Sequence, residues 1–516
     1  MHHSTFSAQE LAAAKNATTV SVCLPARDEA RTVGRIVGTV RAELIERVKL
    51  VDEIAVTDDR STDATAAVAA GAGATVVRVP RTARPESGKG VAMAVAVAES
   101  CGDVVVFCDA DVENFASHFV VGAKAAETLR AEGFDGRVVL IGDEAQRPYE
   151  RPPLSKEYLR GEKDFDAAAV HPAGFYDEQQ IELRTSTVVT GVDLGAFEVT
   201  VSSGERIAYD RLLLATGATP RRLSVPGSDL DGVHLRSIAD ADALRDAIGP
   251  SSEAVVIGAG WIGAEVAASA RQLGAAVAMV ELASVPLERV LGVEVGAIYR
   301  GLHAEHGVDL HFDVGVDALL GSSAVEAVRL SDGTVLPATA VVVGVGVTPR
   351  VELAEAAGLG VDNGVVVDEH LRTSAPGIFA AGDVAAAFHP RYGTRIRLEH
   401  WSAALNQGPA AAQSMLGHAV TYDRIPYFFS DQYDLGMEYR GWAPSFDQVV
   451  FRGEPASRAF IAFWLRHGRV AAAMNANIWD AGDAIEALLQ SGRPVAPARL
   501  ADPDVDLAEL AASSTA

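Results

Sequence analysis

Short apolar runs rich in valine and isoleucine recur along the chain, and several lead into a turn of small residues and then a helical pattern. The clearest is the run at residues 254–257, which leads into the turn Gly258-Ala-Gly-Trp-Ile-Gly263 and an alanine-rich helix. A second strand at residues 276–280 ends on Glu281. Strands that alternate with helical patterns in this way predict an α/β fold with parallel sheets.

The turn between these two strands has the spacing GxGxxG, with an acidic residue about 20 positions further on. Gly258 allows a tight turn, Gly260 lets a pyrophosphate approach the backbone, and Gly263 lets the helix pack closely on the strand. The N-terminus of the helix then faces the phosphates. Glu281 can accept hydrogen bonds from the adenosine ribose and would repel a 2′-phosphate, so the sequence predicts NADH rather than NADPH.

Three further strand-like runs carry Gly217, Gly346 and Asp383 at or near their ends. A single run of this kind is usually just a buried strand and its turn. Their order around the NADH segment makes these three residues candidates for cofactor binding.

The chain has 516 residues, enough for roughly three or four domains. Its formal net charge of −25 argues against nucleic acid or an anionic membrane as a partner. No apolar run approaches the roughly 20 residues of a membrane span, and the N-terminus lacks the features of a signal peptide, so we expect a soluble, cytoplasmic protein. The three cysteines form no CxxC pair, which disfavours disulfides, structural zinc and dithiol chemistry.

Seven ordered motifs extend from about residue 119 to about residue 510. They are Gly142-Asp-Glu144, Tyr149-Glu-Arg-Pro-Pro-Leu-Ser-Lys156, Tyr209-Asp-Arg-Leu-Leu-Leu-Ala-Thr-Gly217, the Gly258 turn, Gly377-Ile-Phe-Ala-Ala-Gly-Asp383, Glu399-His-Trp401 and Phe429-Ser-Asp-Gln-Tyr-Asp434. In this order they resemble the ferredoxin reductase branch (putidaredoxin and rubredoxin reductases) of the two-dinucleotide-domain flavoprotein disulfide reductases.

The resemblance implies two Rossmann-like domains, with an NADH domain (234–353) inserted into a discontinuous FAD domain (119–233 and 354–424). A C-terminal α/β reductase domain (425–516) would help form the flavin pocket and a homodimer or partner surface. Asp143 would bind the adenosine ribose, Val189 the adenine, Asp383 the ribityl chain and Trp401 the flavin ring. Outside the Gly258 turn and Glu281, the full set of implied cofactor contacts is Gly122, Asp143, Arg151, Lys156, Val189, Gly217, Gly346, Asp383, Glu399 and Trp401.

The implied chemistry passes hydride from NADH to flavin and then single electrons to a ferredoxin- or rubredoxin-type iron–sulfur protein. Lys156 would lie near the reactive edge of the flavin, and Glu265, two residues after Gly263, near the nicotinamide. We expect these two side chains to pair when NADH docks. Residues 119–516 contain no cysteine, so a dithiol cannot accept the electrons there and a single-electron carrier is the better acceptor.

The FAD domain departs from the family pattern at its first motif. The segment around residues 117–129 keeps the helix, and Gly122 matches the third glycine of a GxGxxG turn, but the first two glycines are absent. Those glycines let bare backbone amides cradle the FAD pyrophosphate. A shortened strand at Val120 and Val121 would preserve weak flavin binding.

Residues 1–118 resemble the nucleotide-sugar half of a GT-A glycosyltransferase, in particular of the glucosyl-3-phosphoglycerate synthase type. Three strands at about residues 19–26, 54–58 and 103–108 each lead into polar or acidic residues. The resemblance implies uridine contacts at Pro25–Glu29 and Asp59, a diphosphate contact at Lys89, and a divalent cation (Mg²⁺ or Mn²⁺) at Asp109 and Asp111. The acceptor-binding half of that family is missing.

Both truncations fall at the same place, and no Pro/Ser/Gly-rich linker separates the two parts. The simplest hypothesis is a fusion of two truncated genes or gene models. The main prediction is therefore an FAD-dependent NADH:ferredoxin reductase with a truncated glycosyltransferase segment. Two alternatives stay open: a UDP-glucose glycosyltransferase, and a non-catalytic fusion remnant that binds only NADH.

Overall fold

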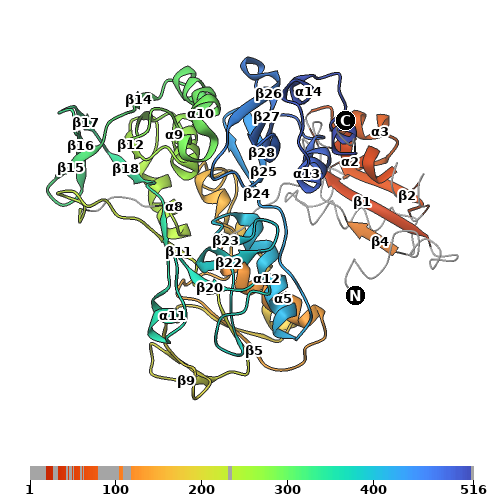
Figure 1. Ribbon diagram of the computed structural model, residues 1–516, viewed down its shortest axis with the longest axis vertical. Coiled ribbons are helices and arrows are strands. Elements are labelled where there is room, and N and C mark those ends of the chain that lie inside the picture. The colour runs from red at the N-terminus through yellow and green to blue at the C-terminus, as the bar shows by residue number, and fades with distance from the viewer. Residues whose placement is uncertain are drawn as a thin grey trace. The chain divides into compact units, whose positions relative to one another are not determined.

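The structure is a computed structural model, and it describes residues 19–26, 33–41, 45, 49, 51–58, 61, 63–79, 104–107, 118–230 and 235–512. Two compact units make up the chain, residues 1–114 and 115–516 (Figure 1). Five predicted nucleotide-sugar or metal residues lie outside the described residues: Glu29, Asp59, Lys89, Asp109 and Asp111. Of the predicted set in this first unit, Pro25 alone falls within a described strand.

The first unit contains a four-stranded parallel sheet of order β3-β2-β1-β4. Its strands are rich in valine and isoleucine because they are covered by apolar helix faces, and their side chains form one core. This arrangement agrees with the predicted α/β segment. The elements are β1 (Val20–Ala26), α2 (Val33–Val40), β2 (Glu53–Asp58), α3 (Thr65–Gly71), β3 (Thr75–Arg78) and β4 (Val104–Phe107).

The second unit opens on helix α5 (His118–Ala131), which packs along helix α12 (Trp401–Met415) (Figure 1). Val120 and Val121 are helical and buried, so they do not form the shortened strand that was the condition for weak flavin binding. No turn residue separates them from the alanine-rich helix, and both pack into the core that contains Leu214 and Ala380. The apolar side chains of both valines are therefore buried in the core as part of helix α5.

The remaining strands of the predicted FAD domain form several small sheets. Within the described residues, β5 and β6 form one parallel pair, and β10 and β21 form another. An antiparallel sheet β7-β8-β9 and a mixed sheet β20-β22-β23 complete this region. The bounds are β5 (Val138–Ile141), β6 (Ile181–Arg184), β7 (Val189–Asp193), β8 (Glu198–Val201), β9 (Arg206–Ala208), β10 (Leu212–Leu214), β20 (Val365–Val367), β21 (Ile378–Ala380), β22 (Ala385–His389) and β23 (Thr394–Ile396).

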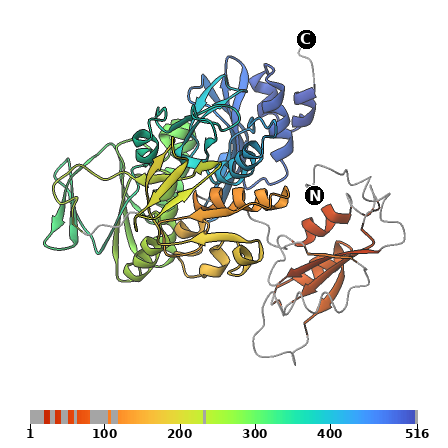
Figure 2. The same ribbon diagram turned by 90° about the horizontal axis from the view of Figure 1, so that it is seen from below.

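The predicted NADH segment folds as a parallel sheet of order β14-β13-β12-β18. The central strand β12 is buried over four consecutive residues, as a parallel strand covered on both faces requires. A three-stranded antiparallel sheet, β15-β16-β17, packs against one face of this sheet and lies on the left in Figures 1 and 2. The bounds are α8 (Ile238–Ala247), β12 (Glu253–Ile257), α9 (Trp261–Gln272), β13 (Ala276–Val280), α10 (Glu288–Glu305), β14 (Asp309–His311), β15 (Val316–Gly321), β16 (Val325–Leu330), β17 (Val335–Pro337) and β18 (Ala340–Val343).

The chain enters and leaves this segment through two connections, each of which contains a short strand. They form the antiparallel pair β11 (Ala218–Pro220) and β19 (Val347–Pro349). The four-stranded sheet thus lies in sequence between β10 and β21, which pair with each other. Short elements fill the connections: η3 (Pro152–Ser155), α6 (Phe165–Ala168), α7 (Phe175–Glu178), α11 (Glu352–Ala356) and η4 (Gly382–Val384).

The C-terminal region is a five-stranded antiparallel sheet of order β24-β25-β28-β27-β26. One face packs on α10 and buries Trp464 and Phe460, and the other carries the last helices. In the part of the chain that the structure describes, no helix is long and apolar enough to cross a membrane. The bounds are β24 (Tyr427–Gln432), β25 (Leu435–Gly441), β26 (Gln448–Glu454), η5 (Pro455–Ser457), β27 (Ala459–Arg466), β28 (Arg469–Ala476), α13 (Gly482–Ser491), α14 (Pro497–Ala501) and α15 (Leu507–Ala512).

Candidate functional site

A pocket of about 860 Å³, its open mouth included, lies where the predicted FAD, NADH and C-terminal regions meet. Six residues predicted from the sequence line it: Arg151, Lys156, Glu265, Asp383, Glu399 and Trp401. The other lining residues are Pro152, Leu154, Ser155, Leu235, Arg236, Trp261, Ile262, His400, Phe428 and Phe429.

Lys156 and Glu265 form a buried ion pair at this pocket. Lys156 Nζ lies 3.2 Å from Glu265 Oε1, and the two side chains are 3% and 7% exposed. The Ser155 hydroxyl donates to Glu265 Oε2 at 2.6 Å, and the Ser430 hydroxyl donates to Oε1 at 2.7 Å. Lys156 also lies 4.9 Å from the centre of the Phe429 ring. The two residues that are expected to pair are thus in direct contact in this structure.

A buried hydrogen-bond chain continues from Glu265 into the C-terminal region. Gln432 Nε2 donates to Ser430 Oγ at 3.2 Å, and Gln432 Oε1 lies 3.0 Å from His303 Nε2. Because the amide oxygen is an acceptor, the proton of the neutral imidazole sits on Nε2. The Tyr433 hydroxyl can then donate to His303 Nδ1, at 3.4 Å. Sequence patterns do not reveal this chain, since its members come from α9, α10 and β24.

Burial makes His303 sensitive to acid. The side chain is fully buried, and desolvation lowers the pKa of His303 to about 4 from an ordinary value of 6.5. In the unfolded chain it binds a proton as the pH falls below 6.5, whereas in the folded chain it stays neutral until about pH 4. Folded stability should therefore fall with decreasing pH across this window.

We expect this residue to contribute a loss of roughly 1.4 kcal/mol in the free energy of unfolding per pH unit between about 6.5 and about 4. Urea unfolding of the full chain at a series of pH values checks this, with the variant His303→Gln expected to show a shallower slope. His418→Gln is the control, because His418 is exposed. Parallel pH slopes for His303→Gln and the unmodified chain would contradict the assignment.

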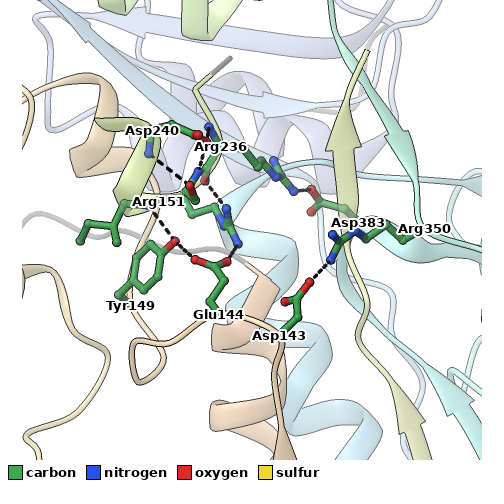
Figure 3. Close-up of polar contacts among 10 residues, drawn as sticks. Asp143, Glu144, Tyr149, Arg151, Arg236, Asp240, Arg350 and Asp383 are labelled. Atoms are coloured by element: carbon green, nitrogen blue, oxygen red, sulfur yellow. Dashed lines mark hydrogen bonds and ion pairs between the residues drawn. The ribbon is translucent and has the colours of Figure 1, made fainter. Parts of the chain in front are cut away.

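A second buried ion pair joins Asp383 and Arg236, with Nη2 and Oδ2 3.0 Å apart (Figure 3). Asp383 is 4% exposed in its side chain, and it sits in η4 directly after β21. Burial lowers the pKa of Arg236 to about 10, and Asp383 opposes that shift. Arg236 precedes the capping box of α8, in which the Ser237 hydroxyl and the Asp240 carboxylate bond each other's backbone amides. Arg236 was not predicted, because no motif in the sequence marks an arginine that pairs across 147 residues.

Acidic and basic side chains also pair on the side of the site assigned to adenosine. Asp143 bonds Arg350 at 2.9 Å, and both are more than two-fifths exposed. Glu144 accepts hydrogen bonds from Arg151 and from the Tyr149 hydroxyl (Figure 3). The motifs at residues 142–144 and 149–156 therefore meet in space, as their joint assignment to one cofactor requires.

The other predicted contacts lie apart from the pocket. Val189 begins β7 and is partly buried, and Gly217 has a φ of +69° between β10 and β11. Gly346, with a φ of +100°, precedes β19. Gly122 lies inside α5, where an added Cβ would come 2.6 Å from Leu140 Cδ1. Gly122 thus lets α5 pack closely on β5; its predicted contact with a cofactor stays a prediction.

The turn after β12 has a geometry that only glycine permits at two of its three positions. Gly258 has a φ of +97°, and a Cβ there would lie 2.6 Å from the Gly344 carbonyl oxygen. A Cβ on Gly263 would lie 1.9 Å from the Gly258 oxygen. Gly260 caps α9, and its Cβ would meet no heavy atom closer than 4.0 Å. The open side of the turn is at Gly260, which is where the sequence places the pyrophosphate.

Glu281 follows β13 and lies beside this turn. Its carboxylate accepts hydrogen bonds from the backbone amides of Ala259, at 2.8 Å, and Ala283, at 3.1 Å. These contacts hold the carboxylate next to the glycine turn, at the end of the neighbouring strand. That position suits the predicted contact with an adenosine ribose and the predicted repulsion of a 2′-phosphate.

Replacing Glu281 with alanine should reduce the preference for NADH over NADPH by about tenfold or more, the effect of losing one hydrogen bond to a charged group. Titration of the full chain with each nucleotide, followed by quenching of tryptophan fluorescence, gives the two dissociation constants. Asp309→Ala on the adjacent strand β14 removes the same charge and is the matched control. An unchanged ratio of dissociation constants in Glu281→Ala would refute the assignment.

The pocket can be tested for fit to a flavin from its unpartnered polar atoms. Three buried side-chain nitrogens that belong to lining residues have no hydrogen-bond partner within the described residues: Arg236 Nε, His400 Nδ1 and Trp401 Nε1. An isoalloxazine carries carbonyl oxygens and ring nitrogens along one edge, and so offers acceptors to such donors. Trp401 and Phe429, in an edge-to-face contact with ring centres 6.1 Å apart, supply aromatic surface. The pocket therefore fits the ring half of a flavin.

Comparisons with known proteins find similarities to both parts of the chain. Residues 21–176 match the model of glycosyl transferase family 2, which supports the glycosyltransferase resemblance of the first unit. Residues 120–408 match the pyridine nucleotide-disulphide oxidoreductase model, and residues 427–511 match the reductase C-terminal model. The glycosyl transferase match and the oxidoreductase match overlap at 120–176, which lies directly after the junction that the sequence places at about residue 118.

Full-length ferredoxin reductases align with most of the second unit. The 5,5′-dehydrodivanillate O-demethylase ferredoxin reductase subunit of Sphingobium is 40% identical over 76% of this chain and 96% of its own. Two solved structures are similar: a ferredoxin reductase from Rhodopseudomonas palustris (TM-score 0.74, 37% identity, 77% of this chain and 98% of that chain) and putidaredoxin reductase in a covalent complex with putidaredoxin (TM-score 0.73, 36%, 77% and 97%). This chain therefore belongs to the pyridine nucleotide-disulphide oxidoreductase family, in its ferredoxin reductase branch.

Proposed function

We propose that the second unit takes electrons from NADH and passes them, through a bound flavin, to a ferredoxin- or rubredoxin-type iron–sulfur protein. The observation that carries this proposal is the buried Lys156–Glu265 pair, which joins a predicted FAD-domain motif to the helix that begins at the NADH turn. The known partner of one similar protein, putidaredoxin in its covalent complex, supports an iron–sulfur carrier as acceptor. The use of NADH favours a cytoplasmic location.

Residues at different positions of the pocket would have different roles. The turn at Gly258–Gly263 and Glu281 bind the dinucleotide, so that the nicotinamide reaches the pocket beside Glu265. When bound, a flavin accepts hydride from a nicotinamide and releases its electrons singly. Lys156 would hold a positive charge beside the ring, and Trp401 would pack against it. Orientation and electrostatics are the contribution of the protein, and no nucleophile or general base is required.

Steady-state reduction of a ferredoxin by the full chain tests this function. The chain is first supplied with flavin, and NADH and a plant- or bacterial-type ferredoxin are then added without oxygen. We expect ferredoxin to be reduced at a rate that depends on both flavin and NADH. Binding of NADH without ferredoxin reduction would favour the alternative of a non-catalytic remnant, and release of UDP from UDP-glucose would favour a glycosyltransferase.

A further inference from the structure

Two segments of this chain can be compared with each other: the glycine turn after β12, and the segment before α5, where the family pattern has a similar turn. After β12, Gly258, Gly260 and Gly263 leave the backbone bare, and Gly260 faces open space. Before α5, by contrast, the sequence has no glycine between Gly102 and Gly122. A dinucleotide diphosphate is held mainly by backbone amides that approach it without an intervening Cβ. The turn after β12 can make that contact, and the segment before α5 lacks the glycines that the contact requires.

The sheet around α5 is also incomplete within the described residues. β5 pairs with β6, and β10 pairs with β21, but no described strand joins the two pairs. In a doubly wound sheet the first strand is central and delivers the phosphate-binding turn. Here the first turn of α5 packs directly on the segment after β21: a Cβ on Gly382 would lie 2.7 Å from Val121 Cγ2. Val121, which directly precedes Gly122, is therefore a packing residue of the helix.

The half of the site that receives the ring retains its parts. The Lys156–Glu265 pair is formed, the aromatic side chains line the pocket, and three buried nitrogens have no partner among the described residues. Asp383, predicted to hold the ribityl chain, is buried and anchored by Arg236. In the proposed binding mode, all of these groups would contact the part of the cofactor that riboflavin and FAD share.

We infer that this chain holds a flavin by its ring and ribityl half, so that riboflavin binds about as tightly as FAD. The inference rests on the proposed function, because it concerns the same pocket. An intact turn gives the FAD diphosphate several charge-assisted backbone hydrogen bonds, each strong enough to change affinity by about tenfold or more. Without that turn the phosphates and adenosine bring FAD no such advantage over riboflavin.

Fluorescence titration of the purified full chain, freed of flavin, tests the inference with riboflavin and FAD as the probes. We expect the two dissociation constants to agree within about tenfold. FAD binding more than about tenfold tighter than riboflavin would overturn the inference, as would the absence of binding by either flavin. The variant Trp401→Ala is expected to weaken both flavins by the same factor, because its contact is with the ring.

A second variant tests the same inference by a separate measurement. The segment Gly-Ala-Gly-Trp-Ile, copied from residues 258–262, is inserted between Val121 and Gly122 to rebuild a GxGxxG turn. In the folded variant, confirmed by circular dichroism, we expect FAD to gain at least about tenfold over riboflavin. If the insertion does not fold, the comparison of Trp401→Ala with the unmodified chain decides alone, and loss of FAD binding without loss of riboflavin binding would overturn the inference.

The proposed function can fail separately. If both flavins bind alike but NADH reduces neither, the inference stands and the proposed function is wrong. If FAD binds far more tightly than riboflavin and NADH reduces it, the inference is wrong and the proposed function stands.

Discussion

Replacing Gly263 with alanine should weaken NADH binding by about a hundredfold or more and lower the free energy of unfolding by about 1–3 kcal/mol. The reason is steric: a Cβ at this position would lie 1.9 Å from the Gly258 oxygen and 3.3 Å from Val256 Cγ1. Helix α9 would have to move away from β12, and the turn that faces the pyrophosphate would move with it. Urea unfolding and NADH titration measure the two effects.

The same substitution elsewhere in this region is a matched control. Gly301 lies within helix α10, and an added Cβ there meets no heavy atom within 4 Å. Gly301→Ala should therefore leave NADH binding unchanged and stabilise the fold by about 0.5–1 kcal/mol, since alanine favours a helix over glycine. If both variants bind NADH normally, Gly263 is not needed for close packing of the turn, and the assignment of this turn to NADH loses its structural basis.

Replacing Glu265 with leucine should destabilise the second unit by about 3–5 kcal/mol, because it leaves the buried ammonium of Lys156 without its carboxylate. The hydroxyls of Ser155 and Ser430 would lose their acceptor as well. The double variant Lys156→Met/Glu265→Leu removes both charges and should recover most of the lost stability. Urea unfolding of the two single variants and the double variant measures this coupling.

The kinetic part of this prediction concerns Lys156 alone. Lys156→Met should slow hydride transfer from NADH to the bound flavin, because the positive charge beside the ring is gone. Stopped-flow absorbance of the flavin gives the rate. Unchanged hydride transfer would exclude a role for Lys156, and a stability loss below about 1 kcal/mol in Glu265→Leu would show that the pair is not the buried ion pair of this structure.

The parts of the site that could be predicted are those in which one local segment carries the information. The Gly258 turn is such a case, since the glycine spacing, the preceding strand and Glu281 lie within about 30 residues. Lys156 and Glu265 are 109 residues apart and became candidates through the family motifs, not through spacing. Their burial, and the two serines that bond Glu265, could not be read from the sequence.

Contacts across the fold account for the residues that prediction missed. Arg236 approaches Asp383, and Ser430 approaches Glu265, only because separate regions of the second unit pack together. Val120 and Val121 are a different case. The sequence left open whether they form a short strand, and the continuous helical segment and the apolar core around Leu214 and Ala380 place them in α5.

The most direct test of the central claim is a single turnover of the flavin-supplied full chain with NADH, followed by the visible absorption of the flavin. We expect NADH to bleach the flavin, NADH carrying deuterium on its transferred position to do so more slowly, and added ferredoxin to restore the colour. A flavin that is bound by the chain but stays oxidised in excess NADH would contradict electron transfer from NADH through the flavin.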